Sequence, residues 1–167
     1  MSREQTGDWR LGIEEREEDR ELVLVSACLA GYPCRYDRQS RTDERVVRLV
    51  REGRAIPICP EQMGGLTTPR PPAEIQVRAG GDVHVVTVHG EDVTAAFLRG
   101  AEATLRIPGR CGVRRAVLKQ NSPSCGVGKV YDGTFSGTLT EGYGVAARLL
   151  ADSGIEVEIL WITMMNI

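Results

Sequence analysis

The residues with the most distinctive chemistry in this sequence are its five cysteines: Cys28, Cys34, Cys59, Cys111 and Cys125. An odd number of cysteines does not make a complete disulfide framework. None of them forms the CxxC pair from which closed zinc sites are often built. Free cysteines of this kind are either small buried hydrophobes or ligands for soft metals, so their positions in the fold decide between the two.

Cys28, Cys59 and Cys125 each come just beyond a segment that is predicted to be a strand. The carboxyl ends of parallel strands share one edge of a sheet, and ligands bind outside that edge. We therefore expect the three sulfurs to converge there. Three thiolates would hold three irons of a [4Fe–4S] cluster and leave the fourth iron open to substrate.

Other polar residues are predicted to lie at the same edge. Glu61 follows Cys59 by two positions and is a candidate acid or base, or else a structural ion-pair partner of Arg70. Ser122 precedes Cys125 by three positions and would orient a water or a substrate carbonyl, or else serve only in its Ser-Pro turn. Lys119 would offset negative charge at the site or be solvated.

The remaining candidate ligands are less well placed. Cys34 is a candidate fourth thiolate, a reserve ligand or a packing residue. Cys111 precedes its strand and so falls at the opposite edge of the sheet, where we expect a structural role. His84 and His89 both fall in or beside a predicted hairpin arm, which argues against a histidine-based metal site.

The segments that position these residues alternate between strand and helix. This order predicts an α/β fold: a single domain with a three-layer, mostly parallel, Rossmann-like sheet, an inserted loop and hairpin, and helices on both faces. Pro57 disfavours a central place for its strand. The expected strands are residues 22–25, 55–58, 115–119 and 155–162; the expected helices are 42–52, 92–106 and 145–150; a loop at 64–74 and a strand or hairpin arm at 83–88 are inserted.

Composition limits the class of protein. The chain has 167 residues, is 41% hydrophobic and 26% charged, and carries a net charge of −2. Residues 1–21 are acidic and are expected to form a flexible extension before a domain at 22–167, which is itself nearly neutral. A nearly neutral domain is not an expected partner of duplex nucleic acid. The sequence has neither a membrane-spanning run nor a secretory signal, so a cytoplasmic protein is expected.

A series of short motifs runs along the domain. They are SACLAG at 26–31, CRYD at 34–37, CPE at 59–61, GGL at 64–66, TPRPPAE at 68–74, DVT at 92–94, LK at 118–119, SPSCG at 122–126 and YDGTF at 131–135. This series resembles a bacterial and archaeal family, the thiouracil desulfidases, long listed as a domain of unknown function. The resemblance covers roughly residues 22–157. Residues 37–38 (Asp-Arg) depart from a common Asp-Gly, and the acidic extension lies outside the family pattern.

The resemblance implies a [4Fe–4S] cluster held by Cys28, Cys59 and Cys125. It further implies Glu61 as catalytic acid or base and Ser122 as assisting hydroxyl. The implied reaction is a non-redox desulfuration of a 2-thiouracil-like pyrimidine: the unique iron captures the sulfur and water replaces it at carbon. The implied substrate is a small thiolated pyrimidine or thionucleoside, and a thiolated tRNA base stays among the candidates.

Two other functions fit the cysteines. One is a metal-free thiol redox or persulfide-carrying protein that uses Cys28 and Cys34, which requires accessible thiols of low pKa. The other is a zinc-stabilised module that binds modified RNA. The nearly neutral domain and the missing CxxC pairs argue against the zinc module.

Overall fold

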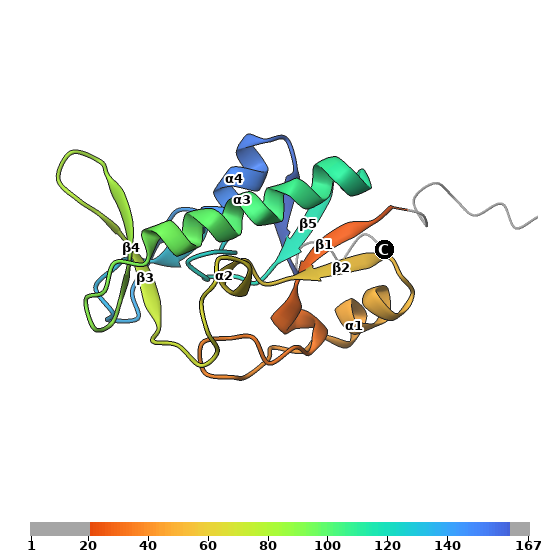
Figure 1. Cartoon of the computed structure of the whole chain (residues 1–167), viewed down its shortest axis with the longest axis horizontal. Coiled ribbons are helices and arrows are strands. Elements are labelled where there is room, and N and C mark those ends of the chain that lie inside the picture. The colour runs from red at the N-terminus through yellow and green to blue at the C-terminus, as the bar shows by residue number, and fades with distance from the viewer. Residues whose placement is uncertain (1–20, 161–167) are drawn as a thin grey trace, which may run out of the picture.

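The computed structural model describes residues 21–160, and its centre is a four-stranded parallel sheet with the strand order β2-β1-β5-β8 (Figure 1). The fold class predicted from the sequence is therefore confirmed. The sheet strands are β1 (Val23–Ser26), β2 (Ala55–Ile58), β5 (Arg115–Leu118) and β8 (Glu156–Ile159). The helices are η2 (Ala27–Ala30, 3-10), α1 (Glu44–Arg51), α2 (Pro60–Met63), α3 (Thr94–Cys111) and α4 (Val145–Asp152).

Strand β1 lies inside the sheet, and its side chains are buried on both faces of the sheet. Val23 and Val25 belong to one core cluster, and Leu24 belongs to the other. Strand β2 lies at the edge of the sheet, where Pro57 pairs with Val25. The expectation that a proline disfavours a central strand is confirmed, since a residue without an N–H is tolerated at a sheet edge.

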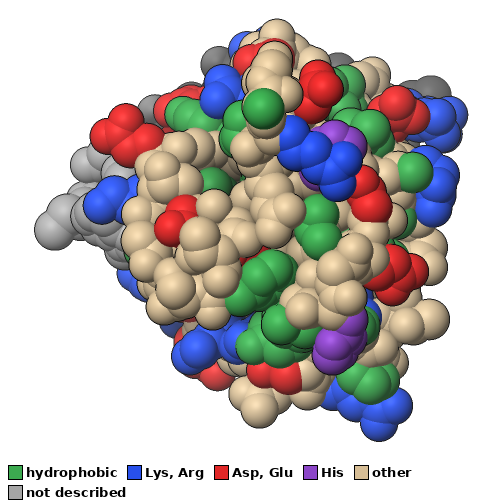
Figure 2. Space-filling model, turned by 90° about the vertical axis from the view of Figure 1, so that its left-hand side faces the viewer, with side chains coloured by type: hydrophobic (Ala, Val, Ile, Leu, Met, Phe, Trp, Pro, Cys, Tyr) green, Lys and Arg blue, Asp and Glu red, His purple; other side chains and the backbone are tan. Residues whose placement is uncertain are grey.

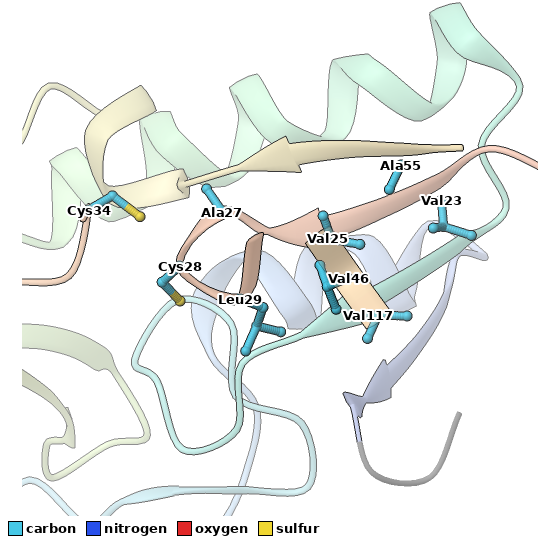
Figure 3. Packing of buried hydrophobic residues seen from close by; sticks show 9 residues of the cluster. All are labelled: Val23, Val25, Ala27, Cys28, Leu29, Cys34, Val46, Ala55 and Val117. Carbon is cyan, nitrogen blue, oxygen red and sulfur yellow. The ribbon is translucent and has the colours of Figure 1, made fainter. Parts of the chain in front are cut away.

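The two core clusters make the fold three-layered. On one face, Val46 of α1 packs with the valines of β1 and with Val117 (Figure 3). On the other face, Ala147 and Leu150 of α4 pack with Leu24, and α3 lies against α4. Helices therefore cover both faces of the sheet, as predicted (Figure 1).

Two antiparallel ribbons are added to this core. They are β3 (Ala73–Val77) with β4 (Val83–Thr87), and β6 (Lys129–Tyr131) with β7 (Leu139–Glu141). The segment at 83–88 is a hairpin arm, as expected. Figure 2 shows the end of the molecule that carries β3 and β4, where Lys and Arg side chains are scattered among acidic ones rather than gathered into one patch.

Some predicted boundaries differ from the structure. Helix α3 continues to Cys111 rather than ending near residue 106, although Pro108 lies inside it. It ends at Gly112, whose left-handed conformation (φ 68°) allows its N–H to bond the Pro108 carbonyl. Strand β8 ends at Ile159, and the last residues expected in it lie outside the described range.

The predicted acidic extension lies outside the described residues except for Glu21, which pairs with Arg115 at 3.5 Å. Among residues 21–160, no helix has the length and apolar character needed to span a membrane.

Candidate active site

The carboxyl ends of β1, β2 and β5 open onto one cavity of about 470 Å³. Cys28, Cys34, Cys59 and Cys125 all line it. The structure thus brings the three cysteines that follow strands to one place, with Cys34 beside them. Figure 3 shows Cys28 and Cys34 at one end of the buried hydrophobic cluster to which they belong.

Each cysteine is held by a short local structure. Cys28 lies in η2, the 3-10 turn that directly follows β1, and Cys59 is the residue before α2, which begins at Pro60. Cys125 lies in a turn where its N–H donates to Ser122 Oγ at 3.1 Å. Cys59 Sγ lies 3.9 Å from the Cys34 carbonyl oxygen. These backbones are therefore fixed before any ligand is bound.

Burial and mutual contact make several of the thiols hard to ionise. Burial raises the pKa of Cys125 to about 11. A hydrogen bond with Cys28 is the largest cause that raises the pKa of Cys34, also to about 11. Contact with Cys34 and burial raise the pKa of Cys59 far above its ordinary value. The metal-free redox hypothesis requires the opposite, whereas a bound metal ion supplies the positive charge that thiolates need.

The arrangement of the donors fits a cluster better than a single ion. Within residues 21–160, no three His, Cys, Asp or Glu side chains converge closely enough to hold one metal ion. Closed structural zinc sites have four ligands and are often built from CxxC pairs, which this chain lacks. An iron–sulfur cluster takes each thiolate on a different iron, which suits cysteines spread around one cavity.

Glu61 lies in α2 and is bound to Arg70. The Arg70 guanidinium approaches Glu61 Oε2 at 2.6 Å, and the Arg70 and Glu61 side chains are only 8% and 14% exposed, respectively. Arg70 also donates to the Cys34 carbonyl at 3.0 Å and to Thr68 Oγ1 at 3.0 Å. The ion pair considered as an alternative for Glu61 is therefore present. It does not remove Glu61 from the site, since both residues line the cavity.

Two serines connect Glu61 to the cysteine turn. Ser122 Oγ accepts the N–H groups of Ser124 at 3.2 Å and of Cys125 at 3.1 Å, so its role in the turn is present as well. The Ser124 hydroxyl donates to Glu61 Oε1 at 3.0 Å and lies 3.1 Å from Ser122 Oγ. Sequence reasoning missed Ser124. Its only signal was its place between Ser122 and Cys125.

Positive charge also borders the cavity. Lys119, Arg35 and Arg41 line it. Lys119 is half-buried and donates to the Gln120 carbonyl at 3.0 Å, so it is not simply solvated. Burial is the main cause that lowers the pKa of Lys119, and the two nearby arginines lower it further. These cations would offset the charge of thiolates or of an anionic substrate.

Aromatic side chains and a buried glutamate complete the lining. They are Tyr36, Tyr131, Phe135 and Glu74, and sequence reasoning gave none of them a role. Their segments are far apart in the chain, so no local pattern marked them as one wall. Tyr36 and Tyr131 are partly exposed, which is typical of residues at the mouth of a cavity.

The other cysteine and the histidines lie outside this cavity. Cys111 is exposed at the end of α3, so it lies away from the site as expected but is not a packing residue. His84 Nδ1 pairs with Asp92 at 2.8 Å. Neither His84 nor His89 lines the cavity.

Close helix packing holds Glu61 in place. A Cβ atom at Gly64 would lie 2.0 Å from the Ala96 carbonyl oxygen, and one at Gly100 would lie 1.9 Å from the Pro60 carbonyl oxygen. Only glycine fits at either position, and the backbones of α2 and α3 touch there. Helix α3 thus serves as a rigid support for the helix that carries Glu61.

The sequence profile of the 2-thiouracil desulfurase family matches residues 23–159. The chain belongs to this family. The resemblance seen in the motifs is thereby confirmed, and the protein is a member of a family of enzymes.

Two known proteins are similar to this chain. The chain is 45% identical over 141 residues to the uncharacterized protein YbbK of Bacillus subtilis (strain 168), covering 81% of this chain and 93% of YbbK. The solved structure of TudS, a [4Fe-4S]-dependent thiouracil desulfidase, is 46% identical. It superposes with a TM-score of 0.76 over 88% of this chain and 99% of TudS. This 2-thiouracil desulfurase family member therefore shares its fold with TudS over most of the chain.

Proposed function

We propose that this protein is a [4Fe–4S]-dependent desulfidase that converts a thiolated pyrimidine such as 2-thiouracil to its oxo form. The observation that carries the proposal is one cavity on which four cysteines meet a glutamate fixed by arginine and serine. The likeness to TudS supports it. A cavity of about 470 Å³ is in the range of small-molecule sites. The substrate class is therefore a free thiopyrimidine or a thionucleoside.

Cys28, Cys59 and Cys125 would hold the cluster. Cys28 lies in the 3-10 turn after β1, Cys59 directly follows β2, and Cys125 lies in the loop after β5, where its N–H donates to Ser122. Cys34 is the neighbouring thiol and the candidate additional ligand. When bound, the cluster supplies a thiophilic Lewis acid that polarises the C=S bond and takes up the sulfur. Lys119 offsets part of the negative charge at the site.

Glu61 would manage the protons of the reaction. Its Oε2 is held by Arg70, and its Oε1 receives one hydrogen bond from Ser124, so Oε1 is the atom placed to take a proton from the attacking water. The water oxygen bonds to carbon and the C–S bond breaks. One water proton passes through Glu61 to the departing sulfur, directly or by way of a ring nitrogen, and the second is released to solvent as the C=O bond forms. Sulfur leaves as sulfide and no electrons are gained or lost. Ser122 would assist by hydrogen bonding to the water or the ring.

The test is anaerobic iron and sulfide analysis combined with a sulfide-release assay on 2-thiouracil. About four irons per chain are expected, together with sulfide and uracil in equal amounts. Serine variants of Cys28, Cys59 and Cys125 should each lose the cluster, and Cys111→Ser is the matched control that should keep it. A colourless protein that stays inactive after anaerobic reconstitution would refute the proposal, and reversible disulfide formation in its place would favour the thiol-redox alternative.

A further inference from the structure

One wall of the cavity is made by a loop whose backbone is fastened to a different ribbon. We call residues 132–137, between β6 and β7, the 132–137 loop. Phe135 and Gly137 from this loop line the cavity, as does Glu74 from β3. The loop is thus part of the site, although it lies far in sequence from the strand that it contacts.

Glu74 fastens this loop through its carboxylate. The side chain is buried, and Oε2 accepts the N–H groups of Gly133 at 2.9 Å and of Phe135 at 3.0 Å. Gln76 adds a third bond, from Nε2 to the Gly133 carbonyl at 2.9 Å. Within residues 21–160, no basic side chain forms an ion pair with Glu74. The backbone N–H groups of Gly133 and Phe135 therefore stabilise its negative charge. Such charge-assisted bonds are stronger than neutral ones.

The loop backbone needs this fastening. A Cβ atom at Gly133 would lie 2.6 Å from the Ile75 carbonyl oxygen, so the loop touches β3 directly. Phe135 has a φ of 57°, in the left-handed region that a bulky side chain adopts only when its surroundings impose it. The bond from the Phe135 N–H to Glu74 is the contact that selects this conformation. The conformation in turn places Phe135 in the cavity lining.

We propose that Glu74 is a positioning residue: it fixes the 132–137 loop so that the Phe135 ring forms a wall against which the planar pyrimidine of the substrate packs. This inference rests on the proposed function, because it assigns the ring of that substrate to one wall of the same cavity. A phenyl ring gives a flat apolar face, and aromatic rings pack against each other in offset or edge-to-face arrangements. Specificity for a planar heterocycle over a flexible thioamide follows from such a wall.

The wall is expected to act on binding rather than on the chemical step. It contacts a part of the substrate that does not react, whereas Glu61, which is held by Arg70, acts at the reacting carbon. Loss of an interaction made equally in the ground and transition states raises KM and leaves kcat unchanged. A KM increase without a kcat change therefore distinguishes this role from damage to the catalytic groups.

The experiment compares Glu74→Ala, Glu74→Gln and the control Glu141→Gln, an exposed glutamate on β7. For each holoenzyme we would measure iron content, KM and kcat with 2-thiouracil, uracil binding by calorimetry, and hydrogen exchange of the loop amides. Glu74→Ala should raise KM and the uracil Kd about tenfold, the upper range for one aromatic contact, with kcat within about twofold. Its loop amides should exchange faster. Glu74→Gln keeps an acceptor oxygen, so it should stay within about twofold of wild type, as should the control.

Gly133→Ala provides a second route to the same result. It displaces the loop from β3 without changing Glu74, so it keeps the inference testable if Glu74→Ala does not fold. The same rise in KM is expected.

The outcomes separate the two proposals. An active wild type with unchanged KM in both Glu74→Ala and Gly133→Ala would overturn the inference alone. So would a Glu74→Gln variant that is as impaired as Glu74→Ala but whose loop amides exchange as in the wild type, since the charge rather than the loop anchor would then matter. A reconstituted wild type that releases no sulfide would overturn the proposed function. Even then, the role of Glu74 in fixing the loop can be tested: it would be overturned if the amides of the 132–137 loop exchanged hydrogen at the same rate in Glu74→Ala as in the wild type.

Discussion

At the scale of single residues, Glu61 is held at both of its oxygens. Arg70 forms an ion pair with Oε2, and Ser124 donates a hydrogen bond to Oε1. Both partners are held in turn, Arg70 by the Cys34 carbonyl and Ser124 by the bond from its N–H to Ser122 Oγ. A carboxylate held in this way has one orientation and few alternatives, which is what positioned acid–base catalysis requires. Its surroundings, rather than its sequence neighbours, therefore give Glu61 its proposed role.

Replacing this carboxylate should abolish turnover and spare the cofactor. Glu61→Gln keeps the shape of the side chain but cannot accept a proton, so we expect kcat to fall by about 10²- to 10⁴-fold, the usual contribution of a general acid or base. Iron content should not change. Glu102→Gln, on the exposed face of α3, is the control. Full activity in Glu61→Gln would remove this residue from the mechanism.

Arg70 should be irreplaceable by lysine. Its guanidinium reaches Glu61, the Cys34 carbonyl and Thr68 at once, and a lysine ammonium cannot span this fork. We expect Arg70→Lys to lower kcat about tenfold or more with the cluster retained, as judged by iron content and sulfide release. Arg78→Lys, at an exposed ion pair on the β3–β4 hairpin, should behave as wild type. Equal activity of the two variants would contradict this view of Arg70.

The sequence predicted the chemistry of this site only in part. The three cysteines that follow strands, together with Glu61 and Ser122, could be predicted to lie at the site, because their motifs come just beyond predicted strands. Ser124 and Glu74 could not, because their partners lie 63 and 59 residues away in the chain. No local pattern indicates such contacts.

At the scale of elements, the contact of α2 with α3 is the tightest support of the site. Gly100→Ala would place a Cβ atom 1.9 Å from the Pro60 carbonyl oxygen, and backbone there has to move. We expect a loss of about 1–3 kcal/mol in the free energy of unfolding, typical of overpacking, and reduced kcat because α2 carries Glu61.

The same helix offers a matched control for this prediction. A Cβ atom at Gly109 meets nothing within 4 Å, so Gly109→Ala should be neutral or stabilising by about 0.5–1 kcal/mol through helix propensity. Denaturant unfolding and sulfide release would be measured on both variants. If Gly100→Ala were as stable and as active as Gly109→Ala, the close contact between α2 and α3 would contribute neither to stability nor to activity.

The elements were predictable where burial alone determines them. Strands β1 and β2 are continuous apolar runs, and α1 begins after its N-cap Asp43, whose side chain accepts the Arg45 N–H. Strands β3, β6 and β7 were not predicted, because they are short ribbons held by each other and by Glu74 rather than by the core. Helix α3 was predicted too short: Pro108 removes one backbone hydrogen bond but does not end the helix.

At the scale of the whole molecule, one bound group would connect three separate strands. Cys28, Cys59 and Cys125 extend from the ends of β1, β2 and β5, so a cluster would close three loops at once. A ligand that binds only the folded state stabilises it by mass action. We expect cluster removal to lower Tm by about 4–8 °C, which corresponds to about 2 kcal/mol for a chain of this size. Thermal unfolding before and after anaerobic chelation would measure this, and Cys111→Ser should show the same difference. Equal Tm values with and without iron would show that the loops are rigid on their own.

The position of Pro57 on β2 has a consequence for the behaviour of the protein in concentrated solution. An open sheet invites strands from other chains to add to its margins. Here one margin is a strand of 4 residues in which proline lacks a donor, and the other is β8, where Glu156 and Glu158 bring like charges to any copy that approaches. Both margins are thus poor templates for self-assembly, and Pro57→Val is the single change that would restore a donor to the first.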